Sequence, residues 1–269
     1  MAKIKTTQAE LDEIFAKLSR EHKRLNERQQ AYAVKELGRV RSEVASILAE
    51  HSDDDGIVPR RRMRMILRDL DGFENTLRET GEIAIEKIIE DTSYATISDV
   101  NKALGVSVSK AQFDRINEYV VRYVIKRFGD DGLVLSDRVW GLSGEIRDEI
   151  STVIRSGVIK GESVSSMMPK VRAVYDTETW KIRRLVRTES STAQRAAISY
   201  NAQSSDLVKW VQFHDGTCGR KDHHKHACYA LANEDRYGKG QGVYKPNDAD
   251  IWMPHPNCTS YITYIVDDI

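Results

Sequence analysis

The chain has 269 residues, and its 41 basic and 41 acidic side chains give a formal net charge of zero. This balance excludes a protein that coats nucleic acid through its overall charge, so any contact with DNA must be local. The length is enough to bury a core without disulfides. Three cysteines, an odd number, together with the lack of an apolar N-terminal segment or a long apolar run, predict a protein of a reducing compartment that does not cross a membrane.

The first stretch, from about Thr7 to Glu50, has apolar residues at helical spacing and charged residues nearly everywhere else. This pattern predicts a helix or a helical hairpin with a narrow apolar seam. The seam fits packing inside the protein's own helical bundle, and it also fits docking against a partner protein. The sequence leaves both interpretations open.

Another helix is predicted after the turn residues Ser52 to Gly56, with Pro59 in its first turn. The helix opens with a cluster of arginines: Arg60, Arg61, Arg62, Arg64 and Arg68. Such a cluster fits contact with DNA phosphates or with an acidic partner surface. It also fits a solvated face whose arginines pair with Asp53, Asp54 and Asp55.

Further helices are predicted from periodicity and capping residues. They run from Ser109 to Arg127, from Ser136 to near Gly157, from Gly161 to around Pro169, and from Thr177 to about Tyr200. After the first of them, the turn from Gly129 to Gly132 predicts a domain boundary. We therefore expect an N-terminal helical region at residues 1–132 and a C-terminal core at residues 133–269.

The last of these helices carries an acidic residue in its apolar stripe. Glu189 lies one turn beyond Leu185 and one turn before Ala193, so its carboxylate should point into the core. A buried carboxylate needs a partner, which predicts a structural polar anchor formed by Arg187, Thr188 and Glu189. A catalytic acid or base is the alternative interpretation of Glu189.

The character of the sequence changes after this helix. Alternating apolar and polar residues predict strands at Leu207 to Phe213 and at Thr259 to Val266. We therefore expect an α+β fold with a predominantly α-helical body and a small C-terminal region that contains antiparallel strands.

The same C-terminal region holds all three cysteines and five of the seven histidines. Zinc takes tetrahedral thiolate and imidazole ligands, and the spacing predicts a structural zinc ion held by Cys218, Cys228, His255 and Cys258. His223, His224 and His226 are variant ligands. The alternative is that the cysteines are small buried apolar side chains and that the histidines belong to an exposed polar loop.

A nuclease is the enzymatic alternative for the same residues. It would need a metal-activated water and a general base, for which His214, Asp215, His223 and His224 could supply parts. A DNA-binding accessory protein that uses the arginine cluster is a further alternative.

Fragments of the second half occur in a recognisable order. They are Leu135–Trp140, Gly157–Ser163, Arg187–Glu189, Trp210 leading to Asp215–Cys218, and Pro254–Cys258. In this order they resemble the phage head-morphogenesis proteins, which are the Mu F-like minor head (minor capsid) proteins of tailed bacteriophages. The resemblance covers about half of the chain, from Leu135 onward.

The resemblance implies a minor structural protein of the virion that acts in procapsid assembly or at the portal and that assists DNA packaging or delivery. The expected partners are the phage portal protein, the major capsid or scaffolding protein, and viral DNA. We expect the portal or scaffold contacts in the N-terminal helical region, residues 1–132. The expected location is the head interior or the portal region, and the host cytoplasm during assembly. No enzymatic activity and no membrane contact are expected.

The chain departs from the usual pattern of that family at two places. The early Cys-x-x-Cys-like pair is here spread out, with nine residues between Cys218 and Cys228, and Ser260 stands where the final cysteine would be. His255 or a loop histidine would then supply the missing ligand.

Overall fold

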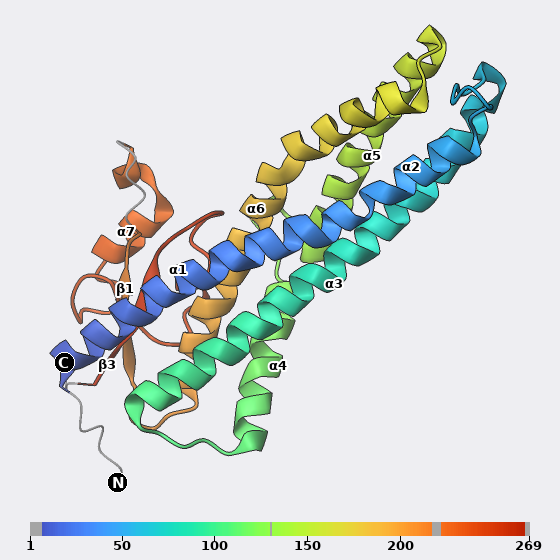
Figure 1. Cartoon of the computed structure of the whole chain (residues 1–269). Helices are drawn as coiled ribbons and strands as arrows, with labels where there is room; N and C mark the ends of the chain where they lie inside the picture. Colours follow the sequence, from blue (N-terminus) through green and yellow to red (C-terminus); the bar gives the residue numbers. More distant parts are fainter. Residues whose placement is uncertain (1–6, 130, 217–221, 267–269) are drawn as a thin grey trace. The chain divides into compact units, whose positions relative to one another are not determined.

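A computed structural model describes residues 7–129, 131–216 and 222–266. The described residues are predominantly helical, with a small antiparallel sheet near the C-terminus, so the predicted α+β class is confirmed (Figure 1). The helices are α1 (Gln8–Arg39), α2 (Arg41–Glu50), α3 (Met63–Leu104), α4 (Lys110–Lys126), α5 (Leu135–Lys160), α6 (Val164–Gln203) and α7 (Ala227–Asn233), with 3-10 turns η1 (Arg60–Arg62), η2 (His223–Lys225) and η3 (Ala249–Ile251). No helix in these ranges is long and apolar enough to cross a membrane.

The sheet consists, within the described ranges, of β1 (Trp210–His214), β2 (Val243–Tyr244) and β3 (Tyr261–Ile265), in the order β2-β1-β3. Both pairings are antiparallel, and Val211 of the central strand lies opposite Tyr244 on one side and Tyr264 on the other. Strands β1 and β3 lie within or close to the predicted ranges, whereas β2 follows a glycine-rich arm and was not predicted.

The chain forms two compact units, each made of separate segments. One unit contains Met1–Gln29, Glu86–Asp130 and Arg184–Ile269, and the other contains Gln30–Ile85 and Asp131–Arg183. One break falls at 130/131, close to the predicted boundary, but both units contain residues from both sides of it. The division into residues 1–132 and 133–269, which rests on the turn from Gly129 to Gly132, remains a prediction. We call the unit that contains the sheet the sheet unit, and the other the helical unit.

The sheet unit joins the first turns of α1 to the last strand. The side-chain amide of Gln8 donates a hydrogen bond to the Tyr264 carbonyl (2.8 Å) and accepts one from the Val266 backbone amide (3.1 Å), so it satisfies backbone groups of β3 and of the residue that follows it. Phe15 packs against the Tyr264 ring, with centroids 4.8 Å apart. The beginning of α1 therefore covers the edge of β3 that β1 leaves free.

Farther along the sheet unit, its helices share a buried polar network. The side chains of Gln29, Thr92 and Ser190 form a closed triangle of hydrogen bonds, with Gln29 to Thr92 at 2.7 Å, Ser190 to Gln29 at 2.7 Å and Thr92 to Ser190 at 3.1 Å. A polar group in a helical core needs a partner at one defined position, so this triangle fixes the register of α1, α3 and α6 in the sheet unit.

In the helical unit, both ends of α5 differ from the predicted ends. The helix begins at Leu135, one residue before the predicted cap Ser136, because the side chain of Asp137 accepts a hydrogen bond from the Val134 amide (3.2 Å). It continues past Gly157 to Lys160 and ends at Gly161, whose φ of 72° is the left-handed conformation that glycine adopts at helix ends. Gly157 lies inside the helix, where a Cβ atom would collide with the Met167 side chain.

The prediction of two helices around Pro169 and Thr177 was wrong, because α6 runs without interruption from Val164 to Gln203. Proline removes one helical hydrogen bond and crowds the preceding turn. Here that cost is offset by packing, since Met167, Val171 and Tyr175 are all buried on the same helix around Pro169.

Candidate metal site

The candidate ligands that the structure describes come from two short segments of the sheet unit. His223 lies in η2, His226 is the N-cap of α7 with an extended backbone, and Cys228 is buried in the first turn of that helix. His255 and Cys258 lie in the loop before β3, where Asn257 has a φ of 62° and makes the tight turn that separates them.

Cys228, His255 and Cys258 form a first ligand group. Their sulfur and nitrogen atoms all lie within 4.8 Å of one another, and the His255 Nε2 atom is 3.1 Å from the Cys228 sulfur. The His255 Nδ1 atom is 2.9 Å from the Pro256 carbonyl oxygen, which can only accept a hydrogen bond. Nδ1 therefore carries a proton, and Nε2 is the nitrogen that faces sulfur and can bind a metal.

These separations fit a metal shell. Zinc–sulfur and zinc–nitrogen bonds of about 2.3 and 2.0–2.1 Å at a tetrahedral angle place sulfur and nitrogen ligands about 3.6 Å apart. A backbone carbonyl that holds the second nitrogen of a histidine is also the usual arrangement around a metal ligand. The first ligand group could hold a metal ion.

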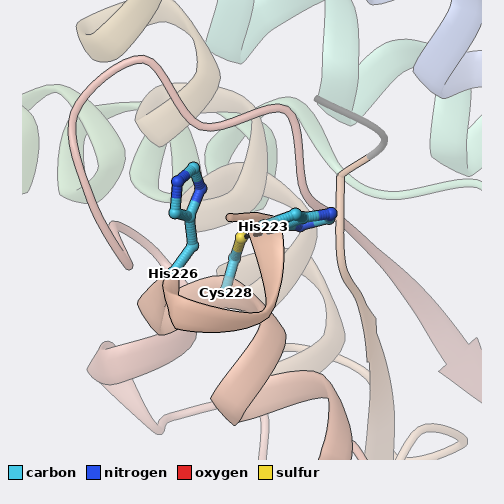
Figure 2. A group of neighbouring side chains, drawn as sticks. All are labelled: His223, His226 and Cys228. Carbon is cyan, nitrogen blue, oxygen red and sulfur yellow. Dashed lines mark hydrogen bonds between the residues drawn. The ribbon is translucent and has the colours of Figure 1, made fainter. Parts of the chain in front are cut away.

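His223, His226 and Cys228 form a second ligand group, which shares Cys228 with the first and whose atoms also lie within 4.8 Å of one another (Figure 2). The His223 Nε2 atom is 3.6 Å from the Cys228 sulfur and 3.7 Å from Asp215 Oδ2. His224, in contrast, is exposed and belongs to neither group. Of the variant ligands predicted from the sequence, the structure brings His223 and His226 to the cysteine and leaves His224 outside.

The thiols of the first ligand group are electrostatically distinct. A hydrogen bond from Cys228 lowers the pKa of Cys258 to about 3, against burial, and His255 and the Arg195 guanidinium act in the same direction. The pKa of Cys228 is raised, because its proton is held in that hydrogen bond and because the sulfur is buried. Thiolate is the form that binds metals, so the surroundings of Cys258 prepare it as a ligand.

Ser260, the residue at the position of the family's final cysteine, is part of this preparation. Its hydroxyl is 3.1 Å from the Cys258 sulfur, and its backbone amide donates to the same sulfur at 3.4 Å. Ser260 is therefore a hydrogen-bond partner of a ligand.

Helix α6 fixes the loop that carries His255 and Cys258. The buried guanidinium of Arg195 donates to the carbonyls of Trp252 (2.7 Å) and Ser260 (3.0 Å), one on each side of the loop. Thr188 accepts a hydrogen bond from the Asn257 amide at 2.9 Å. Arg195 was not predicted from the sequence; its signal is a single long charged side chain inside a run of mostly small residues, Ser190 to Ser199.

A glycine brings a further segment against the loop. A Cβ atom on Gly216 would lie 2.6 Å from the Thr259 carbonyl carbon and 2.8 Å from the Ser260 nitrogen, closer than atoms of this kind approach. The chain after β1 therefore rests directly on the backbone that follows Cys258. Cys218, the remaining predicted ligand, lies outside the described residues.

The predicted polar anchor is built around Glu189. Its side chain is 0% exposed and accepts a hydrogen bond from Arg127 at 2.7 Å, and Arg127 is the C-cap of α4. Thr188 contacts the ligand loop, as described above, whereas Arg187 is half-buried and its role remains a prediction. His214, named for the nuclease alternative, stacks on Tyr261 within the sheet.

The arginine cluster lies in the helical unit. Arg60 donates to the Ile159 carbonyl, Arg62 donates to the Ser52 carbonyl (3.1 Å), and Arg68 lies 3.8 Å from Asp69. Arg61 and Arg64 are exposed. Part of the cluster thus supports local structure, and contact with DNA or an acidic partner remains a prediction.

Comparison with known proteins identifies no relative: no family model, no curated protein and no solved structure matches the chain.

Proposed function

We propose that this protein is a minor structural protein of a tailed-phage head, and that a zinc ion bound to the first ligand group stabilises its C-terminal part. The observation that carries the zinc assignment is the convergence of Cys228, His255 and Cys258 on one point, with His255 Nε2 facing the Cys228 sulfur. Two thiolates and an imidazole favour zinc over magnesium or calcium, which prefer oxygen ligands.

A structural role for the ion is supported by its surroundings. Cys228 and Cys258 are 2% and 1% exposed, and Arg195 and Thr188 hold the ligand loop to α6. Buried ligands on fixed backbone are typical of zinc sites that contribute folding free energy. Cys218 remains the predicted fourth ligand.

The role in a phage head rests on the sequence fragments. Two of them, Arg187–Glu189 and Pro254–Cys258, meet through the hydrogen bond between Thr188 and the Asn257 amide. A third, Asp215–Cys218, begins where Gly216 packs against the backbone after Cys258. Residues that carry the resemblance and are distant in sequence thus contact one another. This is expected if they form one structural site.

In this proposal the protein is not an enzyme. It acts during procapsid assembly or at the portal, where its partners are the portal protein and the major capsid or scaffolding protein. Contact with viral DNA during packaging or delivery would use the exposed arginines Arg61 and Arg64.

The zinc assignment is tested by elemental analysis of protein purified without added metal. We expect at least one zinc ion per chain and a loss of about 3 kcal/mol or more in unfolding free energy for Cys258→Ser, because a structural ion binds only the folded protein. His224→Gln, at an exposed histidine outside both groups, is the matched control. Metal-free protein of unchanged stability in a chelator would contradict the assignment.

The head role is tested by co-expression with the portal protein of the same genome. We expect the two proteins to co-purify, and the chain to be found in purified heads at low copy number. If the chain is absent from heads and does not bind the portal protein, the proposal is wrong. Metal-dependent DNA cleavage that disappears in His223→Ala would instead favour the nuclease alternative.

A further inference from the structure

The second ligand group cannot complete the shell of the first without a rearrangement. The groups share Cys228, but neither His223 nor His226 lies within 4.8 Å of all the ligand atoms of the first group. The rings of His226 and His255 are nevertheless adjacent, with centroids 5.1 Å apart. Two sets of ligands therefore share one sulfur atom.

The contacts of His223 have the spacing of ligands around an ion. Its Nε2 atom lies 3.6 Å from the Cys228 sulfur, which equals the tetrahedral sulfur–nitrogen separation of about 3.6 Å. Its other neighbour, Asp215 Oδ2, is 3.7 Å away, beyond the length of a good hydrogen bond. A carboxylate at that distance adds negative potential at the second ligand group and favours a cation there.

His226 provides an independent observation. Its Nδ1 atom is buried and has no hydrogen-bond partner, which is costly for a polar nitrogen. His226 belongs to the same ligand group as His223 and Cys228, and a cation bound through Nδ1 would remove that cost.

We propose that a second divalent transition-metal ion binds His223, His226 and Cys228, with the Cys228 thiolate bridging it to the zinc ion of the first ligand group. This inference rests on the proposed zinc site, because Cys228 bridges only if that site is filled. A thiolate sulfur has enough lone pairs to bind two cations. One sulfur and two imidazoles favour zinc, with cobalt and cadmium as probes.

The two sites differ in their environment. The first ligand group contains two buried thiolates, whereas the second contains one, and the His223 side chain is 20% exposed. Three protein ligands leave a coordination position for water, as in exchangeable or catalytic zinc sites. We therefore expect the second ion to bind more weakly and to exchange faster than the first.

Metal stoichiometry tests the proposal on the full chain. Protein dialysed against buffered zinc should contain two ions per chain, and dilution should remove one of them first. His223→Gln and His226→Gln should each retain one ion, while His224→Gln should retain two. Circular dichroism of each variant checks that its helices are formed.

The possible outcomes separate the two proposals. One ion per chain in the wild type, unchanged in His223→Gln, overturns the second site and leaves the first intact. One ion per chain in the wild type that is lost in His223→Gln overturns the bridge, because the single ion would then be bound by the second ligand group. No bound ion overturns both.

A measurement on the unmutated chain avoids any variant that fails to fold. With ¹¹³Cd in place of zinc, a bridging thiolate should produce two cadmium resonances coupled to each other. A single resonance, or two without coupling at full loading, would contradict the bridge.

Discussion

Glu189 is a charged residue with no exposed surface, held by a guanidinium that is itself only 5% exposed. Removing both charges from water carries a large desolvation cost, which the 2.7 Å contact between them offsets. The pair joins α6 to the end of α4 within the sheet unit. The pair therefore stabilises the fold only when both partners are present.

We expect Arg127→Met to lower the free energy of unfolding by about 3 kcal/mol or more, because the Glu189 carboxylate would stay buried without its guanidinium. Urea unfolding measures the change. The double variant Arg127→Met/Glu189→Gln should recover much of the loss, since it buries no charge.

The matched control lies on the same helix. Arg122 and Glu118 form an exposed pair, so Arg122→Met should change the unfolding free energy by less than about 0.5 kcal/mol. Equal losses in Arg122→Met and Arg127→Met would show that burial of the Arg127–Glu189 pair does not change its contribution to the free energy of unfolding.

His22 makes the stability of the sheet unit depend on pH. Both of its ring nitrogens are buried without hydrogen-bond partners, and burial, aided by the nearby Arg195 charge, lowers its pKa to about 3. The unfolded chain binds a proton near pH 6.5, whereas the folded chain does not until about pH 3. The contribution of neutral, buried His22 to the free energy of unfolding is therefore fully present above about pH 6.5, and it is lost as the pH decreases toward 3.

We expect the stability difference between the wild type and His22→Phe to change with pH in that window, by up to about 1.4 kcal/mol per pH unit. Chemical unfolding from pH 7 to pH 4 gives the difference at each pH, and other titrating groups cancel because both proteins contain them. A difference that does not vary with pH would mean that His22 is accessible to protons in the folded chain.

At the scale of single residues, a structural role could be predicted from the sequence where the residue type is unusual for its position. Glu189 was identified because a carboxylate in an apolar stripe needs a partner, and Cys228, His255 and Cys258 because of their chemistry. Arg195 was missed because its partners are backbone carbonyls of Trp252 and Ser260, which no sequence pattern reveals.

Among the structural elements, the segment after β1 is held by contact with the backbone that follows Cys258. Gly216→Ala would force a Cβ atom into the Thr259 and Ser260 backbone. We expect a loss of about 1–3 kcal/mol in unfolding free energy together with weaker zinc binding, because the backbone after Cys258 must shift. Thermal unfolding and a competitive zinc titration measure the two effects.

Gly141→Ala is the control for this substitution. Gly141 lies inside α5 with nothing within 4 Å of an added Cβ atom, so alanine there should be neutral or stabilise the helix by about 0.5–1 kcal/mol. If Gly216→Ala behaves like Gly141→Ala, the segment is free to move and does not support the site.

Helices and strands were predicted where apolar spacing is regular, as for α4, β1 and β3. The errors have physical causes. Pro169 was taken as a helix end, but neighbouring buried side chains offset its cost. Strand β2 has only two residues and depends on Gly242, whose carbonyl accepts from the Phe213 amide (2.8 Å), a contact with no sequence signal.

At the scale of the whole molecule, both described ligand groups belong to the sheet unit. We expect a chelator to increase amide hydrogen exchange in peptides from 184–216 and 222–266 more than in those from 30–85 and 131–183, because local stability follows the unit that binds the metal. Mass spectrometry of exchanged peptides measures this. In Cys258→Ser the chelator should have a smaller effect than in the wild type, and an equal increase in both units would contradict the prediction.

The predicted fold class is confirmed because it depends on summed periodicity over long segments. The segments that make up each unit could not be predicted, since a continuous helical pattern gives no sign of where its contacts change. Helices α1, α3 and α6 each contribute residues to both units, without a break in their sequence pattern.

The hydrogen bonds between Gln8 and the last strand connect residues that the ribosome makes far apart in time. The bond to the Tyr264 carbonyl spans 256 positions. A ribosome that adds about 5–20 residues per second needs roughly 10–50 s to cover that distance. During this interval the first turns of α1 have emerged without their final partner, so the sheet unit completes its folding only when its last strand is made.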